Sequence, residues 1–272
     1  MKERVDVLLV QQGFFESREK ARRAIMAGLV FNENERIDKP GTKLNTDVVL
    51  RIKGNPLPYV GRGGLKLEKA LKIFTFSVEN KIVLDIGSST GGFTDCALQN
   101  GATKVYALDV GYNQLAWKLR NDERVIVMEK TNFRYSRPED FIEGLPQVAT
   151  ADVSFISLKK ILPPLTTILI PSGEAVVLIK PQFEAGREEV GKKGIVRDPK
   201  VHRHVLDDIL AFAVQEGYCV RGLDFSPITG GDGNIEFLAH LEWTGDAMQG
   251  KNLLSYQRIE EVLQLAHQAF RS

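Results

Sequence analysis

Apolar and polar positions alternate along most of the chain in blocks that predict strands separated by helices. From residue 59 onward, short apolar runs are followed by stretches with the 3.6-residue period of an amphipathic helix. Repeated strand–helix units favour a largely parallel sheet that is covered on both faces. The expected strands are 81–86, 104–109, 125–129, 147–152, 174–180, 218–225 and 235–242, with further helices near 63–74 and 254–270.

The connection between the last two expected strands is too short to contain a crossover helix. Only the loop Pro227 to Gly233 separates them, so we expect these two strands to pair antiparallel. The predicted fold is therefore an α/β, Rossmann-like domain. Its sheet has seven mostly parallel strands, of which the last is antiparallel.

The first 56 residues follow a different pattern. Val5 to Val10 has the apolar spacing of a short helix, and Ser17 is a suitable N-cap for a second helix that ends before Gly28. Short strands are expected at 29–31 and 47–52, which predicts a small α+β domain. The linker Asn55-Pro56-Leu57-Pro58 has two prolines in three positions, which stop both helices and central strands. We therefore expect one domain at 1–57 and a second at 58–272.

Composition excludes several classes of protein. No apolar run approaches the roughly 18 residues of a membrane span, and the N-terminus is too charged for a signal peptide. Cys96 and Cys219 lie far apart and are interpreted as free thiols of a reducing compartment, so a cytoplasmic location is expected. His202 and His204 are two residues apart on an expected helix and do not share a face, so no metal site is expected.

The small net charge of +1 conceals an asymmetry between the two ends of the chain. Residues 1–72 contain 15 lysines and arginines against 9 acids, whereas the remainder contains 21 against 26. This imbalance suggests a module for an anionic partner, although it is modest enough to arise by chance on solvated surfaces. The second expected helix concentrates four of these cations, namely Arg18, Lys20, Arg22 and Arg23.

A glycine-rich turn follows the first apolar run of the larger domain, in Asp85-Ile86-Gly87-Ser88-Ser89-Thr90-Gly91-Gly92-Phe93. A strand that enters such a turn and then a helix forms a nucleotide-binding loop at the carboxyl edge of a sheet. Three residues separate Gly87 from Gly91, which fits the loop of S-adenosylmethionine (SAM) methyltransferases better than the dinucleotide pattern. Asp109 ends the next strand, where a ribose-binding carboxylate is expected. The alternative is a plain strand–helix turn with a capping acid. The candidate cofactor-binding residues are Asp85, Gly87, Ser88, Gly91, Gly92, Phe93 and Asp109.

Four charged residues are expected near the same edge of the sheet. Asp152 and Lys180 each end an apolar strand, and Glu236 opens the antiparallel one. Lys66 lies near the start of the helix that precedes the first strand. Charged groups are costly beside a buried strand unless they are paired, so their convergence would indicate a function. The alternatives are a helix cap for Asp152, a lysine extended to water for Lys180, and solvated surface positions for Glu236 and Lys66.

The N-terminal segment resembles the small RNA-binding domain first described in a small-subunit ribosomal protein, the S-four type. The resemblance implies that Arg4 and the four cations of the second helix bind RNA phosphates. The matching residues are Arg4-x-Asp6-x-Leu8-Leu9, Gly13-Phe14, Ser17-Arg18-x-x-Ala21, Ile25-x-x-Gly28-x-Val30, Lys39-Pro40-Gly41 and Asp47.

The whole chain resembles the TlyA family of SAM-dependent ribosomal RNA ribose 2′-O-methyltransferases, several of which are named hemolysins. The resemblance implies an FtsJ-like catalytic domain, SAM as cofactor, cytidine as acceptor, and ribosomal RNA or ribosomal subunits as partner. It also implies that the family's Lys-Asp-Lys-Glu tetrad falls on Lys66, Asp152, Lys180 and Glu236. The matching motifs are Tyr59-Val60-x-Arg62-Gly63-Gly64-Leu65-Lys66-Leu67, Asp85 to Asp95, Asp152 to Leu158, Leu178 to Glu184, and Gly233 to Phe237.

The role of Lys180 and the function itself have alternatives on sequence grounds. Lys180 would either remove the proton of the ribose hydroxyl or, still charged, orient it and stabilise the developing alkoxide. Two rival functions are a cytolysin, as the family's other name suggests, and an RNA-binding protein that senses SAM without catalysis. Against the cytolysin, the sequence lacks both a signal peptide and a membrane-spanning pattern. Against the sensor stand the four charged residues.

Overall fold

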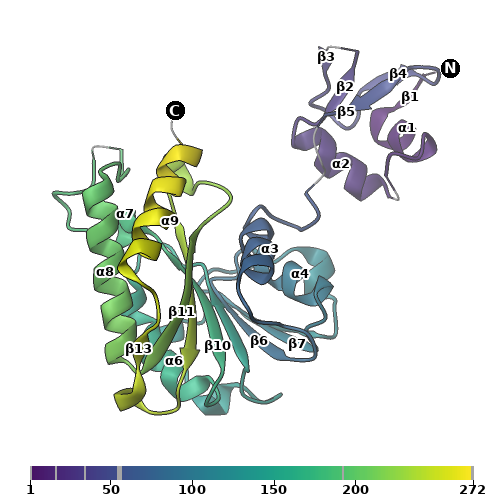
Figure 1. The fold of residues 1–272 in the computed structure, drawn as a ribbon. Helices are drawn as coiled ribbons and strands as arrows, with labels where there is room; N and C mark the ends of the chain where they lie inside the picture. The colour runs from purple at the N-terminus through teal and green to yellow at the C-terminus, as the bar shows by residue number, and fades with distance from the viewer. Residues whose placement is uncertain (1, 16, 34, 54–56, 192, 271–272) are drawn as a thin grey trace. The chain divides into compact units, whose positions relative to one another are not determined.

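The structure is a computed structural model that describes residues 2–15, 17–33, 35–53, 57–191 and 193–270. The chain forms two compact units, residues 1–58 and 59–272 (Figure 1). Of the expected linker, Asn55 and Pro56 lie outside the described residues.

The N-terminal unit packs two helices against short strands. Its core is made of small and branched apolar side chains, among them Leu8, Leu9, Ala21 and Ile25. Ser17 caps the second helix as expected, because its hydroxyl accepts the amide hydrogen of Lys20. The elements are β1 (Lys2–Arg4), α1 (Val5–Gln11), α2 (Arg18–Met26), β2 (Val30–Asn32), β3 (Glu35–Arg36), β4 (Lys43–Asn45) and β5 (Leu50–Ile52).

The sequence predicted only two of these five strands. Pairs β1–β4, β2–β3 and β2–β5 are all antiparallel. The expected strand at 47–52 is shorter than predicted, because a turn closed by Val48 N–H to Asn45 O occupies its first residues. Strands of two or three residues carry too little alternation to be recognised in a sequence.

The larger unit is built on one mixed sheet with the order β13-β11-β12-β10-β9-β6-β7-β8. All seven expected strands are present, and β12 is antiparallel to both of its neighbours, as predicted. The sheet has eight strands and not seven, because β13 pairs with the edge of β11 through two residues. The strands are β6 (Ile82–Ile86), β7 (Lys104–Leu108), β8 (Val125–Met128), β9 (Val148–Ala151), β10 (Glu174–Ile179), β11 (Tyr218–Phe225), β12 (Phe237–Trp243) and β13 (Lys251–Asn252).

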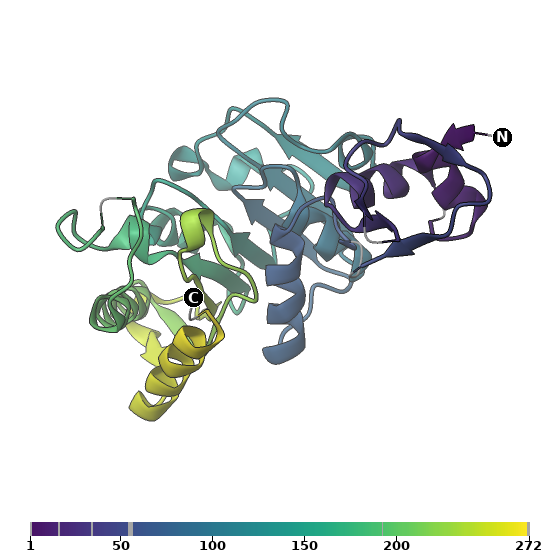
Figure 2. The same ribbon diagram turned by 90° about the horizontal axis from the view of Figure 1, so that it is seen from above.

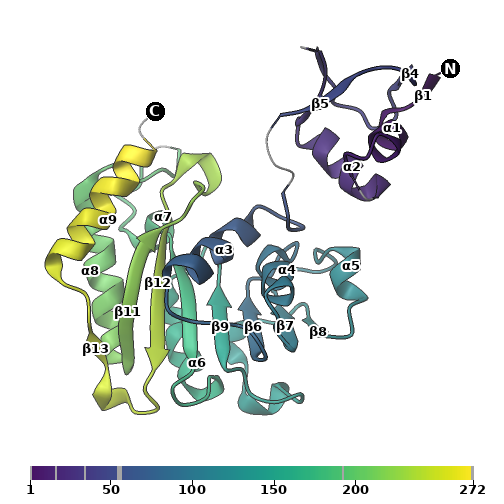
Figure 3. The same cartoon turned by 45° about the vertical axis from the view of Figure 1, so that its right-hand side comes forward.

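Helices cover both faces of this sheet (Figure 3). One apolar cluster joins the sheet to α6, α8 and α9, and a second joins its other face to α3, α4 and α5. Helices α8 and α9 lie side by side (Figure 2). The helices are α3 (Gly63–Ile73), α4 (Gly92–Gln99), α5 (Trp117–Arg120), α6 (Leu162–Ile168), α7 (Pro181–Glu184), α8 (Pro199–Gln215) and α9 (Tyr256–Ala269). Short 3₁₀ helices span Phe133–Tyr135, Pro138–Asp140, Leu158–Lys160, Gly231–Gly233 and Ala247–Gln249.

Candidate active site

The register of the sheet brings three of the four predicted catalytic residues to one edge. Ile179 at the end of β10 pairs with Phe237 at the start of β12, so the adjoining Lys180 and Glu236 lie beside each other. Ile86 of β6 pairs with Ala151 of β9, and Asp152 follows directly.

Close packing of α3 against α4 brings Lys66 to the same edge. A Cβ atom on Gly92, at the start of α4, would lie 2.8 Å from the backbone nitrogen of Gly64 and 3.1 Å from the carbonyl oxygen of Gly61. Only glycine permits this approach of two backbones. Gly92 therefore sets how closely α3 approaches α4 and, through α3, where Lys66 lies.

The four side chains form one buried ionic cluster. Lys66 Nζ lies 2.9 Å from Asp152 Oδ2 and 2.7 Å from Glu236 Oε2. Lys180 Nζ lies 2.5 Å from Asp152 Oδ1 and 3.9 Å from Glu236 Oε1, and it donates a hydrogen bond of 3.2 Å to Ser154 Oγ. The structure thus brings together all four residues that the sequence had grouped.

Burial and opposite charges act against each other in this cluster. Burial alone would lower the pKa of Lys66, but the adjacent carboxylates of Asp152 and Glu236 outweigh it and raise the pKa above its usual value. Burial alone would raise the pKa of Asp152, but the charges of Lys66 and Lys180 lower it below its usual range. Lys66 and Asp152 are therefore both charged at neutral pH. An apolar cluster would be cheaper to bury, so an ionic one at a cavity indicates a functional site.

The cluster lines a cavity of about 330 Å³. The glycine loop lines the same cavity through Gly87, Ser88, Gly92 and Phe93. A second cavity of about 430 Å³ adjoins it and shares Gly87, Ser89, Asp152 and Ser154 with the first. Asp109 lines this second cavity, as do Val110, Asn132 and Phe133.

The residues of the two cavities fit a nucleoside-containing cofactor such as SAM. Gly87 has a φ of +82°, and a Cβ there would lie 2.7 Å from the carbonyl oxygen of Asp152, so the loop adopts this conformation at the cavity wall only with glycine. Asp109 accepts the amide hydrogens of Ser89 and Gly111 at 2.7 Å each. Each carboxylate oxygen has a further lone pair for a ribose hydroxyl.

Two of the candidate cofactor residues line neither cavity. The buried Asp85 accepts hydrogen bonds from Thr94 N, Thr94 Oγ1 and Thr150 Oγ1, which fix α4 to the strands. Burial raises its pKa to about 6, although hydrogen bonds from the two threonines oppose this shift. Gly91 is the left-handed N-cap of α4, and a Cβ there would lie 2.3 Å from Leu119. The geometry favours a supporting role for both residues.

Sequence reasoning missed several residues that line the cavities, among them the exposed Phe155. Its side chain is 91% exposed, and its φ of +62° is rare for a bulky residue. Its ring lies 5.0 Å from that of Phe183, which follows Lys180. Such an aromatic face beside the cluster is suited to stacking on a nucleobase. The available sequence signal was the presence of a phenylalanine just after each of two charged strand ends.

The N-terminal unit presents a cationic helix. Arg18, Lys20 and Arg22 are exposed on α2, whereas Arg23 is half-buried. Arg4 and Arg18 both bind the buried carboxylate of Asp6, at 2.9 and 3.1 Å. The hydrogen bond from Arg4 is the main reason that the pKa of Asp6 falls to about 2. Lys43, which sequence reasoning missed, lies opposite Arg4 in the β1–β4 pair.

Comparison with known proteins agrees with this fold and site. An FtsJ-like methyltransferase model matches residues 59–243, and an S4 domain model matches residues 3–50. Bacillus subtilis YqxC, which carries the name of an rRNA methyltransferase, is 64% identical over 99% of this chain and 96% of its own length. The 16S/23S rRNA (cytidine-2′-O)-methyltransferase TlyA of Mycobacterium tuberculosis is 40% identical over 92% of this chain and 94% of its own. A solved structure from Streptococcus thermophilus, titled as a hemolysin, is 58% identical, covers 99% of this chain and 97% of its own, and superposes with a TM-score of 0.79.

The fold, the glycine loop and the charged cavity define a methyltransferase with an RNA-binding domain at its N-terminus. The chain belongs to the TlyA family of FtsJ-like methyltransferases. The expected family, fold class and SAM cofactor are thereby confirmed. Among the described residues, no helix is both long and apolar enough to cross a membrane, and no group of three or more metal-ligating side chains is found.

Proposed function

We propose that this enzyme transfers a methyl group from SAM to the 2′-hydroxyl of a cytidine ribose in ribosomal RNA. The observation that carries the proposal is the cluster of Lys66, Asp152, Lys180 and Glu236 on the wall of a cavity beside the glycine loop. SAM supplies an activated methyl group, so the protein's task is to hold the donor and activate the acceptor hydroxyl. A ribosomal RNA substrate implies that the enzyme works in the cytoplasm.

The two lysines divide the work at the acceptor. Lys66 is bound by both carboxylates and remains charged. It therefore contributes positive charge to the site and does not act as a base. Lys180 contacts Ser154 as well as Asp152, at the part of the cavity that is shared with the second one. Its ammonium or amine group is the candidate to contact the hydroxyl, either as a base or as a charge that stabilises the alkoxide. Positioning of the hydroxyl in line with the methyl group supplies much of the rate.

The remaining parts of the site would bind the two substrates. Asp109 and Gly87 would hold the ribose and methionine parts of SAM, and Phe155 would stack on the acceptor base. In the N-terminal unit, the cations of α2 would bind RNA phosphates, which orient the RNA without reading its sequence. The proposal keeps the domain division at residues 57 and 58. Residues 1–57 would dock the RNA, and residues 58–272 would carry out the methyl transfer.

The proposal is tested by analysis of the methylated product. The full-length protein is incubated with labelled SAM and either free ribosomal RNA or ribosomal subunits, and the RNA is digested to nucleosides. We expect 2′-O-methylcytidine, and the two substrates show which form of the RNA is used. Methyl groups on bases would contradict the ribose assignment. Binding of SAM with no transfer to either substrate would favour the SAM-sensing alternative, and lysis of red cells without transfer would favour the cytolysin.

A further inference from the structure

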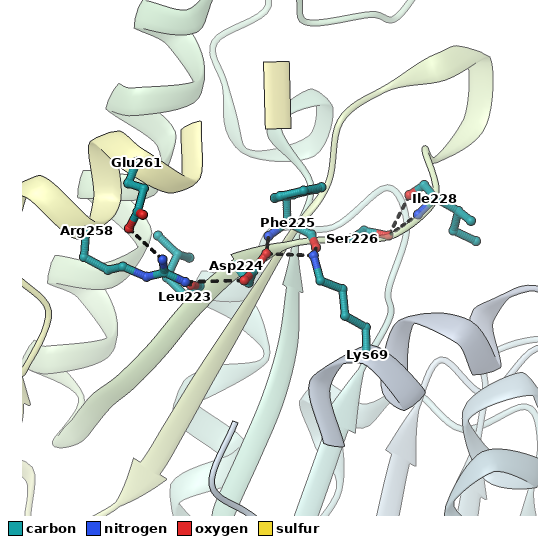
Figure 4. Close-up of polar contacts among 8 residues, drawn as sticks. All are labelled: Lys69, Leu223, Asp224, Phe225, Ser226, Ile228, Arg258 and Glu261. Atoms are coloured by element: carbon teal, nitrogen blue, oxygen red, sulfur yellow. Dashed lines mark hydrogen bonds and ion pairs between the residues drawn. The ribbon is translucent and has the colours of Figure 1, made fainter. Parts of the chain in front are cut away.

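A second lysine of α3 holds the segment that carries the catalytic glutamate. Lys69 lies three residues after Lys66, so the two side chains occupy adjacent positions on one helix face. Lys69 Nζ donates to Asp224 Oδ1 at 2.7 Å and to the carbonyl oxygen of Phe225 at 2.6 Å, as Figure 4 shows. The same Nζ lies 3.7 Å from the centre of the Phe225 ring.

Asp224 is held from the opposite side by α9. Arg258 Nη2 lies 3.4 Å from Asp224 Oδ2 and donates to the carbonyl oxygen of Leu223 at 3.3 Å, while its Nη1 binds Glu261 at 2.8 Å (Figure 4). The last residues of β11 are therefore fixed by a cation from each face of the sheet.

A short chain of hydrogen bonds connects this end of β11 to the active site. The amide of Ser226 donates to the carbonyl oxygen of Glu236 at 2.8 Å. The Ser226 hydroxyl, which is fully buried, donates to the carbonyl oxygen of Ile228 at 2.6 Å. Ile228, Thr229, Gly230 and Gly231 line the cavity. The Gly230 backbone packs closely against the Glu236 carboxylate, because a Cβ atom on Gly230 would lie 2.1 Å from Glu236 Oε1.

We propose that Lys69 is a positioning residue for methyl transfer. It fixes the Phe225 carbonyl and so the start of the loop that forms one cavity wall and returns to Glu236. Lys66 binds the Glu236 side chain directly, so two successive lysines of α3 set the position of Glu236, one through its carboxylate and one through its backbone. Lys69 lines neither of the two cavities, so it would act through Glu236 and not by direct contact with a substrate. The inference rests on the proposed methyl transfer, in which small displacements of a charged group lower the rate steeply.

The first test compares Lys69→Met with Lys72→Met in the full-length protein. Lys72 lies three residues after Lys69 on the same helix, is largely exposed, and pairs only with Glu68 among the ion pairs described. We expect Lys69→Met to lower kcat on ribosomal RNA about tenfold while the KM values for SAM and RNA change less than threefold. Lys72→Met should change neither. Equal kcat values for Lys69→Met and the wild type would overturn the inference.

A double-mutant cycle with Glu236→Gln separates positioning from a general loss of stability. If Lys69 acts through Glu236, the tenfold effect of Lys69→Met should largely disappear in the Glu236→Gln background. Fully multiplicative effects would overturn the proposal. Asp224→Asn keeps the volume of the acid and serves as a second variant should Lys69→Met fail to fold. It should lower kcat in the same direction by a smaller factor, and an unchanged kcat would count against the proposal.

Hydrogen exchange gives a readout that does not depend on activity. The Ser226 amide and its neighbours up to Glu236 should exchange at least tenfold faster in Lys69→Met than in the wild type or Lys72→Met. Unchanged protection would show that Lys69 does not fix the loop from Ser226 to Glu236, and this result would overturn the proposal even if the wild-type enzyme were inactive. If the wild-type enzyme transferred no methyl group but exchange were still faster in Lys69→Met, the proposed function would be refuted. The inference that Lys69 fixes the loop would stand.

Discussion

The four charged residues of the cavity wall differ in how they could be recognised. Asp152, Lys180 and Glu236 each adjoin an apolar strand at the carboxyl edge, so the strand pattern alone grouped them. Lys66 shares its helix with Lys69 and Lys72, and nothing in the spacing distinguishes the three. Only their partners distinguish them. Lys66 binds two carboxylates, Lys69 binds the end of β11, and Lys72 binds the half-buried Glu68. The resemblance to a known family selected Lys66, and contacts in the fold explain why.

Asp109 provides a prediction for the cofactor site. Asp109→Ala should weaken SAM binding by about 1.5–3 kcal/mol, because ribose hydroxyls and two loop amides lose a charged acceptor. Calorimetric titration with SAM measures the effect. Asp109→Asn, which keeps one carbonyl acceptor, is the matched variant and should lose less. SAM affinity equal to that of the wild type in Asp109→Ala would refute the assignment.

At the scale of elements, long apolar strands were predictable and short pairing strands were not. Strands β6 to β12 are runs of four to eight residues whose register follows from burial on both faces. In contrast, β3 and β13 have two residues each and exist only because a neighbouring edge accepts their hydrogen bonds. The positive φ of Phe155 and the loop from Ser226 to Glu236 likewise depend on tertiary contacts that no local pattern encodes.

The packing of α8 against α9 buries His202 beside the half-buried His267, which should make stability depend on pH. His202 Nδ1 lies 2.9 Å from His267 Nε2, and burial, together with the nearby His267, lowers the pKa of His202 to about 4. Its unfolded-state pKa is about 6.5. As pH falls below 6.5, only the unfolded chain gains this proton, so the contribution to stability is lost between pH 6.5 and 4.

This prediction is measured as a difference between two proteins. Asp85, whose pKa is raised to about 6, acts in the opposite direction, because the folded state binds its proton first as pH falls. The wild-type curve alone therefore mixes both effects. Relative to His202→Gln, the wild type should lose on the order of 2 kcal/mol of unfolding free energy between pH 7 and pH 5, measured with denaturant. Parallel curves for the two proteins would contradict the assignment.

At the scale of the whole molecule, the charge asymmetry of the sequence corresponds to a division of labour between two units. The N-terminal unit contributes exposed cations on α2, and the larger unit contributes the cavities and the buried ionic cluster. The sequence could predict a methyltransferase domain and an RNA-binding domain because local motifs mark each of them. It could not predict which cations are free to bind RNA, because Asp6 engages Arg4 and Arg18 through the fold of the small unit.

RNA docking by α2 predicts a change in salt dependence. The double variant Lys20→Gln, Arg22→Gln, at two exposed positions of α2, should bind ribosomal RNA more weakly, and the slope of log affinity against log salt should fall by about 0.7–0.9 for each phosphate that is no longer neutralised. SAM affinity should not change, because both cavities lie in the larger unit. Lys251→Gln, an exposed cation on β13, is the control. An unaltered slope in the double variant would show that α2 does not dock RNA.

The most direct measurement of the central claim is the single-turnover rate of methyl transfer to ribosomal RNA by Lys180→Ala. Lys180 should act chiefly in the transition state, so the rate should fall at least about 10²-fold while the affinities for SAM and RNA change much less. Lys180→Arg keeps the charge but cannot lose its proton, so residual activity would favour orientation of the hydroxyl, and a dead enzyme would favour the general base. Transfer by Lys180→Ala at the wild-type rate would contradict the account of the site.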